Sequence, residues 1–237
     1  MTTINHSARR INTLATLVGA RRYLEIGVDR GATFVDVKLA EKVGVDPCFR
    51  FDAQGQRASG VDLLEITSDR FFATHAAARK PFDLIFLDGL HTFEQTFRDF
   101  CASQACAHDQ TIWLIDDVLP RDVYSSLRTP DDALHFRRSL TGGDSLAWHG
   151  DVFKVVVAIH DFFPSYSYCT VVDGGNAQTV VVRAARRDFR PLLNSLESVS
   201  RLDYFAFLRM RQVLNEIPEL GITDWLAGVR RQAASES

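Results

Sequence analysis

Asp88 and His91 follow a strongly apolar segment, FDLIFL at residues 82–87. The segment is typical of a buried strand, so the two polar side chains lie at its carboxyl end. Ligands of open α/β sheets bind outside the carboxyl ends of the strands. A carboxylate and an imidazole in this position therefore indicate a functional site. His91 is a candidate general base because imidazole exchanges protons near neutral pH.

A second acidic pair, Asp116 and Asp117, follows the apolar segment TIWLI at residues 111–115. If this strand is a neighbour of the one before Asp88, three carboxylates converge on one edge of the sheet. Converging carboxylates need a cation, and Mg²⁺ prefers such oxygen ligands together with water and substrate oxygens. The ion would lower the pKa of a coordinated hydroxyl, whose proton His91 would accept. Structurally, the acidic pair could instead cap a following helix, and the imidazole could be a capping or surface group.

A glycine-containing turn, in the stretch LEIGVDRGATF, follows the first predicted strand. Its pattern is E-x-G-x-x-x-G, with Glu25, Gly27 and Gly31, and the glycines allow a tight turn and a close approach to a ligand. A dinucleotide site would favour G-x-G-x-x-G. The carboxylate of Glu25 instead suits the amino group of a methionine moiety and repels a pyrophosphate. A purely structural strand-to-helix turn is the alternative.

Asp46 lies 19 residues after Gly27, at the end of the second predicted strand. An acidic residue at this distance accepts hydrogen bonds from ribose hydroxyls, although it could also be a turn residue before Pro47. Together with the glycine turn, it favours a cofactor that carries a ribose. The adenine would then lie near the residues that follow the third strand, Thr67, Ser68 and Asp69.

The composition fits one globular domain of 237 residues, 46% hydrophobic and 24% charged. We expect a helix at 5–20, a core at 21–185 and a helical extension at 190–230. The formal net charge of −3 argues against a nucleic-acid partner and favours a small or neutral one. No apolar segment is long enough for a signal peptide or a membrane span, which predicts a soluble cytoplasmic protein. The four cysteines lack C-x-x-C spacing and are expected to be free thiols.

Strand-like segments alternate with helical patterns up to about residue 120, which predicts parallel βαβ units. The five expected strands lie at 23–26, 42–45, 62–66, 82–87 and 111–115. Between them, apolar residues at helical spacing predict helices at 33–41, 68–80 and 92–107. Ser68 or Asp69 would cap the second of these helices.

The segment 151–163 is ambiguous, because its valines favour a strand but its apolar residues fall on one helical face. We predict a helix. Strands at 167–172 and 178–184 then form an antiparallel hairpin through the turn DGGN. The tail from Leu192 to Val229 is predicted to form two amphipathic helices. Its stretch RLDYFAFLRMRQVL carries more apolar residues than a peripheral helix usually exposes, which predicts a homodimer or, equally, packing on its own sheet.

Five parallel strands closed by an antiparallel hairpin are the arrangement of class I S-adenosylmethionine (SAM) methyltransferases, a Rossmann-like α/β fold with helices on both faces. Over residues 22–183, the chain resembles small bacterial, methyltransferase-24-like enzymes related to metal-dependent macrolide- and sugar-modifying O-methyltransferases. The resemblance is carried by YLEIGVDRGATF, KVGVDP, TSDRFF, FDLIFLDGLHTFEQTFRDF, WLIDDVLP and WHGDVFK. It extends loosely to enzymes that methylate mycobacterial mannose polysaccharides.

The resemblance implies a role for each matching residue. In metal-dependent members of that group, the aspartate of D-G-x-H and the later acidic pair hold Mg²⁺, and the histidine is the general base. These roles would fall on Asp88, Asp116, Asp117 and His91. Some relatives carry Glu where this chain has Asp116, which shortens the reach of that side chain. The SAM site would comprise Glu25, Gly27, Gly31, Asp46, Thr67, Ser68, Asp69 and Asp88.

The segments WHGDVFK and DFFPSYSY offer aromatic planes and hydrogen-bonding groups that suit a sugar ring. The candidate acceptor residues are His149, Asp151, Tyr166 and Tyr168. Asp151 could instead cap the following helix, and the neighbouring phenylalanines could belong to the core. We expect a hydroxyl of a saccharide or oligosaccharide as the acceptor, and a phenolic hydroxyl as the second choice. A non-catalytic SAM-binding protein and a NAD-dependent oxidoreductase are the alternatives from other classes.

Overall fold

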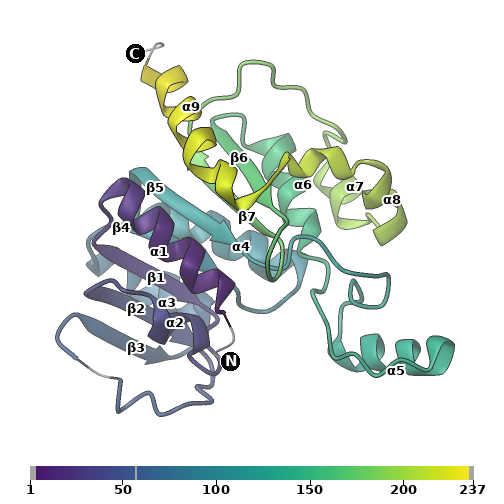
Figure 1. Cartoon of the computed structure of the whole chain (residues 1–237), viewed down its shortest axis with the longest axis horizontal. Helices are drawn as coiled ribbons and strands as arrows, with labels where there is room; N and C mark the ends of the chain where they lie inside the picture. Colours follow the sequence, from purple (N-terminus) through teal and green to yellow (C-terminus); the bar gives the residue numbers. More distant parts are fainter. Residues whose placement is uncertain (1–3, 57, 235–237) are drawn as a thin grey trace.

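The structure is a computed structural model that describes residues 4–56 and 58–234. Its centre is an eight-stranded sheet with the order β3-β2-β1-β4-β5-β7-β6-β8 (Figure 1). The strands are β1 (Arg22–Ile26), β2 (Glu41–Asp46), β3 (Val61–Glu65), β4 (Phe82–Leu87), β5 (Ala107–Ile115), β6 (Tyr166–Val171), β7 (Gln178–Arg183) and β8 (Glu216–Ile217). The first five strands are parallel, and β7 is antiparallel to both β5 and β6. The predicted parallel strands and antiparallel hairpin are therefore confirmed.

Parallel pairing brings the ends of β1, β4 and β5 to one edge of the sheet. Ile26 of β1 is opposite Leu87 of β4, and Leu87 is opposite Ile115 of β5. The residues that follow these strands leave the sheet side by side: Gly27, Asp88 and Asp116. The register thus brings together three of the residues on which the sequence prediction depends.

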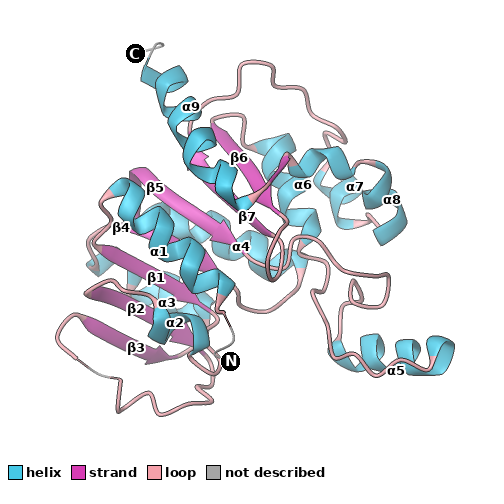
Figure 2. Cartoon of the chain, viewed as in Figure 1, coloured by secondary structure: helices cyan, strands magenta, loops and turns pink. Residues whose placement is uncertain are grey.

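Helices cover both faces of the sheet (Figure 2). They are α1 (His6–Val18), α2 (Ala32–Asp36), α3 (Ser68–Thr74), α4 (Phe93–Ser103), α5 (Pro130–Thr141), α6 (Phe153–Phe162), α7 (Leu196–Ser200), α8 (Tyr204–Arg209) and α9 (Ile222–Ala234), with 3₁₀ turns η1 (Ala76–Ala78), η2 (Gln104–Cys106), η3 (Arg211–Leu214) and η4 (Glu219–Gly221). One buried cluster includes Phe71 of α3, Phe100 of α4 and Val156 of α6. The other includes Leu14 of α1 and Leu226 of α9. No helix in the described part of the chain is both long and apolar enough to cross a membrane.

The ambiguous segment forms helix α6, as predicted. Its valines are tolerated in a helix because Val155, Val156 and Val157 are all fully buried. A helix that is apolar on every side is stable only when it is enclosed by other elements. Here α6 lies between the sheet and the C-terminal elements α7 and η3.

Three sequence predictions about helices need correction. The helix predicted at 33–41 ends at Asp36, because Lys42 at the start of β2 donates to the carbonyls of Phe34 and Val37 and so satisfies the last turn. Thr67, and not Ser68 or Asp69, caps α3 by accepting a hydrogen bond from the backbone of Arg70. A further helix, α5, was not predicted, and it projects away from the sheet (Figure 1).

The C-terminal tail does not form two amphipathic helices. It is divided into α7, α8, η3, β8, η4 and α9. Asn215 has a positive φ of 49° and ends η3, and Pro218 follows directly on β8. β8 pairs with β6 in parallel and so adds an eighth strand to the sheet.

Candidate active site

A cleft of about 950 Å³ lies at the carboxyl ends of the parallel strands. Most residues that the sequence analysis selected line it: Glu25, Gly27, Asp46, Thr67, Ser68, Asp69, Asp88, His91, Asp116 and Asp117. Gly31 does not line the cleft; it precedes α2 with a φ of 73°, and a Cβ there would lie 2.8 Å from the ring of Phe51. The predicted cofactor and metal residues therefore share one cavity, apart from this glycine.

Gly27 lines the cleft and has a left-handed backbone conformation. Its φ is 92°, and a Cβ on it would lie 2.0 Å from the carbonyl oxygen of Asp88. The glycine is thus required where the chain leaving β1 crosses the chain leaving β4. Any larger residue would distort this crossing and with it the site.

Glu25 is a buried carboxyl group inside the cleft, with 1% of its surface exposed. Its Oε2 accepts a hydrogen bond of 2.6 Å from the hydroxyl of Tyr23. Burial raises the pKa of Glu25 well above its usual value, against the smaller effect of that hydrogen bond. A cation in the cleft would favour the ionised form, which fits the ammonium group of a methionine moiety.

Asp46 and the residues after β3 shape the other end of the cleft. The two oxygens of Asp46 accept hydrogen bonds from the backbone of Asp29 at 2.9 Å and of Cys48 at 2.8 Å. Each carboxylate oxygen retains a lone pair for a ribose hydroxyl. Ser68 and Asp69 both accept hydrogen bonds from Gln95 of α4, which fixes the start of α3 against the cleft.

Asp88, His91 and Asp117 form a compact cluster. His91 Nδ1 lies 3.0 Å from Asp117 Oδ2, and His91 Nε2 lies 3.5 Å from Asp88 Oδ1. One ligand atom from each of the three residues lies within 4.8 Å of the other two, a spacing that suits a shared metal ion. His91 Nδ1 is buried without a hydrogen bond that satisfies it. The donor set and this unsatisfied atom fit a divalent cation such as Mg²⁺ held mainly by the two carboxylates.

The buried carboxylates of this cluster and of Asp116 repel one another when all of them are ionised. Burial raises the pKa of Asp88, Asp116 and Asp117 to about 7, and repulsion from a neighbouring aspartate contributes in each case. Burial alone would lower the pKa of His91, but its hydrogen bond to Asp88 and the nearby carboxylates raise it to about 9. A cation bound between the carboxylates would offset the negative charge that raises the pKa of His91. His91 would then become neutral at a lower pH.

Asp116 lies beside this cluster but points to other partners. Its Oδ1 accepts a hydrogen bond from the backbone of Asp117 at 2.8 Å, and its Oδ2 accepts one from Gln178 Nε2 at 3.1 Å. Asp117 itself has a φ of 60°, which is uncommon for a residue other than glycine. The bond to Asp116 therefore helps to hold a strained turn that aims the Asp117 carboxylate at His91.

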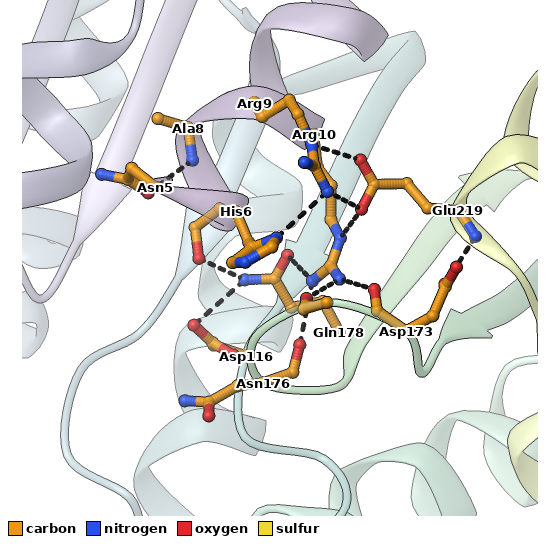
Figure 3. Close-up of polar contacts among 12 residues, drawn as sticks. Asn5, His6, Ala8, Arg9, Arg10, Asp116, Asp173, Asn176, Gln178 and Glu219 are labelled. Atoms are coloured by element: carbon orange, nitrogen blue, oxygen red, sulfur yellow. Dashed lines mark hydrogen bonds and ion pairs between the residues drawn. The ribbon is translucent and has the colours of Figure 1, made fainter. Parts of the chain in front are cut away.

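Gln178 connects Asp116 to a buried arginine on α1 (Figure 3). Its amide donates to Asp116 and to Ser7, and its Oε1 accepts a hydrogen bond of 2.9 Å from Arg10. Arg10 is fully buried and also donates to Glu219 and to the carbonyls of the turn between β6 and β7. This network joins the first helix, the hairpin and the C-terminal segment directly behind the acidic cluster.

Three further residues, none of them among the predicted site residues, complete the site. Trp148 stacks on the ring of His91, with 4.8 Å between ring centroids. Asn176 donates a hydrogen bond of 2.6 Å to Asp117 Oδ1. Gly150 has a φ of 58°, and a Cβ on it would lie 1.7 Å from the carbonyl oxygen of His91. The signals were present, since both the W-H-G segment and the D-G-G-N turn stand out in the sequence.

Only one of the predicted acceptor residues lies close to the cluster. His149 is buried, with its Nε2 3.9 Å from Asp117 Oδ1. Asp151 is buried elsewhere; it accepts a hydrogen bond from the backbone of Phe93 and pairs with Lys154, so it caps α4. Tyr166 and Tyr168 lie on β6 with their hydroxyls bonded to protein groups, and neither lines the cleft.

Comparisons with known proteins agree with this fold. Residues 24–118 match a family model described as a methyltransferase domain. The O-methyltransferase TomG from Streptomyces achromogenes, involved in tomaymycin synthesis and solved with SAM, is 15% identical, with 77% of this chain and 81% of that chain covered and a TM-score of 0.51. The O-methyltransferase from Bacillus cereus in complex with S-adenosylhomocysteine (SAH) is 16% identical, with 76% and 82% covered and a TM-score of 0.50.

The SAH-bound methyltransferase PaMTH1 from Podospora anserina is 17% identical, with 77% of this chain and 80% of that chain covered and a TM-score of 0.50. No match was found among curated protein sequences. Residues 24–118 thus match a methyltransferase domain, and the fold of the chain is that of these solved methyltransferases.

Proposed function

We propose that this chain transfers the methyl group of SAM to a hydroxyl of a saccharide, with Mg²⁺ assistance and His91 as the general base. The observation that carries the proposal is the cluster of Asp88, His91 and Asp117, which lies in the same cleft as Glu25 and Asp46. One cavity thus contains a carboxylate for the amino group of the cofactor, a second carboxylate for its ribose and a base for the acceptor.

The chain's residues have separate tasks in this mechanism. Glu25 binds the ammonium group of the cofactor, Asp46 binds its ribose, and both fix the sulfonium methyl group relative to the acceptor. When bound by Asp88 and Asp117, Mg²⁺ would polarise the acceptor hydroxyl. His91 takes the hydroxyl proton at Nε2, which faces Asp88 at 3.5 Å, because Nδ1 is buried against Asp117. The acceptor oxygen then forms its bond to the methyl carbon as the bond from carbon to sulfur breaks.

The metal and the base depend on each other in this proposal. With its pKa raised to about 9, His91 is protonated at neutral pH and cannot accept a proton. Positive charge held by Asp88 and Asp117 would lower that pKa and release the base. We therefore expect chelation to reduce both acceptor binding and proton transfer.

The acceptor is proposed to be a saccharide because Trp148 offers a flat apolar surface beside His91, on which a sugar ring can stack. A phenolic ring would use the same surface and is the second candidate. Mass spectrometry of methyl transfer from SAM to a panel of sugars and phenols, with and without EDTA, tests both. Transfer to phenols alone would contradict the saccharide assignment. SAH binding without transfer to any acceptor would indicate a non-catalytic SAM-binding protein.

A homodimer also stays a prediction. Of the apolar residues that suggested it, Leu202 and Leu214 are buried in the chain's own core, and Phe205 is the most exposed, at 57%. The remaining surface on α8 is therefore smaller than the sequence indicated. Light scattering at micromolar concentration tests the assembly, and a monomer mass would contradict the dimer.

A further inference from the structure

We propose that a second pocket, next to the acidic cluster, binds an anionic group of the acceptor, either a carboxylate or a phosphate. The acceptor would then be a charged saccharide, such as a uronic acid or a sugar phosphate. This inference rests on the proposed methyl transfer to a sugar hydroxyl and adds the chemical class of its substrate.

The pocket has a volume of about 230 Å³. It is formed by the loop after β5, the turn between β6 and β7, and the segment of α8 and η3. Asn176 lines both this pocket and the cleft. His149 lines the pocket and lies 3.9 Å from Asp117, so a bound molecule can extend from the pocket to the acidic cluster.

The charge of the pocket is opposite to that of the cleft. Its described lining includes Arg121 and Arg211 and contains neither aspartate nor glutamate. The cleft, in contrast, is lined by seven carboxylates: Glu25, Asp29, Asp46, Asp69, Asp88, Asp116 and Asp117. An anionic group is repelled from the cleft and attracted to the pocket, so it would fix the orientation of a sugar that reaches both.

The hydrogen-bonding groups of the pocket are available to a ligand. Arg121 makes no hydrogen bond or ion pair with any residue that the structure describes, although its charge acts on both Asp117 and His149. Arg211 uses Nε and one terminal nitrogen on Glu216, and its Nη1 has no described partner. Guanidinium groups bind carboxylate and phosphate through two parallel hydrogen bonds.

His149 gives a second, independent indication of a ligand. The residue is 2% exposed, and its Nδ1 is buried without a hydrogen bond to any described residue. Buried ring nitrogens are nearly always satisfied, so an unpartnered one in a pocket wall marks a place where a ligand or water completes the structure. Tyr204 on α8 also lines the pocket.

The first test measures the pocket without methyl transfer. Inorganic phosphate is titrated into the SAH-bound protein in EDTA and followed by calorimetry, using the wild type, Arg121→Gln and Arg183→Gln. Arg183 is the matched control, because it lies at the opposite end of β7. We expect phosphate binding that Arg121→Gln weakens at least ~10-fold and Arg183→Gln leaves unchanged. Absence of phosphate binding, or equal affinity in the two variants, would overturn the proposal.

The second test identifies the source of the anion. Initial rates are measured with glucose, glucuronic acid and glucose 6-phosphate as acceptors. We expect one charged sugar to have a KM at least ~10-fold below that of glucose, and Arg121→Gln to remove this difference in KM between the sugars. Equal KM values for all three sugars would overturn the proposal. If phosphate binds through Arg121 but no sugar is methylated, the result would contradict methyl transfer to a saccharide and would still support the anion-binding pocket.

Discussion

At the scale of single residues, substitution of His91 and substitution of its two carboxylate neighbours should affect the reaction differently. We expect His91→Ala to leave SAH affinity unchanged and to lower kcat by about 10² to 10⁴, the range for a lost general base. The loss should shrink at high pH, where the acceptor hydroxyl ionises unaided. A pH–rate profile of the two proteins tests this, and wild-type turnover by the variant would exclude His91 as the base.

Asp117→Asn should act on the ion and the acceptor. The variant loses a ligand charge, so we expect a higher Mg²⁺ concentration for half-maximal rate together with a higher KM for the acceptor. The exposed Asp131 of α5 supplies a matched control, Asp131→Asn, which removes the same charge away from the cluster. Activity titrations with Mg²⁺ after chelation provide the measurement. Full activity of the wild type after exhaustive chelation would contradict the metal assignment.

Gly150 offers a residue-scale test of how His91 is held. A Cβ at Gly150 would lie 1.7 Å from the His91 carbonyl, whereas one at Gly142 would meet nothing within 4 Å, although both glycines have positive φ. Gly142→Ala should therefore cost only about 1 kcal/mol of backbone strain. Gly150→Ala should destabilise the protein more and lower kcat, because the chain that carries His91 must move. Thermal unfolding and initial rates distinguish them, and equal effects would refute the clash.

At the scale of elements, Arg10 joins α1 to the hairpin and to η4. Arg10→Met would leave Gln178 Oε1 and the buried carbonyls of Asp173 and Asn176 without their donor, so we expect a loss of about 3 kcal/mol in unfolding free energy. Arg9 pairs with the same Glu219, but its side chain is 44% exposed, and Arg9→Met should cost less than about 1 kcal/mol. Denaturant unfolding of both variants tests this. Similar losses in the two variants would show that the burial of Arg10 does not determine its contribution to the unfolding free energy.

The elements also show what the sequence could predict. The parallel strands were predictable because β1, β4 and β5 are short apolar segments whose ends carry Glu25, Asp88 and Asp116. Trp148, Asn176 and Gly150 were not, because they lie in loops that reach the cluster from distant parts of the chain. Their roles depend on tertiary contacts such as the stacking of Trp148 on His91, which has no periodic signal. The prediction that Tyr166 contacts the acceptor was wrong for the same reason. An aromatic residue in a strand has the same sequence pattern whether it packs in the core or lines a site.

At the scale of the whole molecule, the buried cluster makes stability depend on pH. The pKa of Asp116 is raised from about 4 in the unfolded chain to about 7, so the folded state binds more protons across this interval. The pKa of His91, about 6.5 when unfolded, is raised to about 9. Both effects stabilise the fold at low pH and are lost as pH rises, the first by about pH 7 and the second through pH 9.

In EDTA, the melting temperature should therefore fall between pH 5 and pH 9. Mg²⁺ should raise it more at pH 8 than at pH 5.5, because protons compete with the ion for the carboxylates. Differential scanning calorimetry across this pH range provides the measurement. The melting temperature of Asp117→Asn should depend less on pH than that of the wild type. A melting temperature that rises with pH in EDTA would contradict the raised pKa values.

The network around Arg10 also constrains the order in which the chain can fold during synthesis. Arg10 emerges from the ribosome early, but Gln178 and Glu219, which accept its hydrogen bonds, are made 168 and 209 residues later. Until then, its charge has no partner that would permit burial, and α1 cannot dock in its final place. The strands β1 to β5 can pair first, with one face of the nascent sheet open. The acidic edge of the sheet can therefore reach its final packing only after Glu219 has been synthesised.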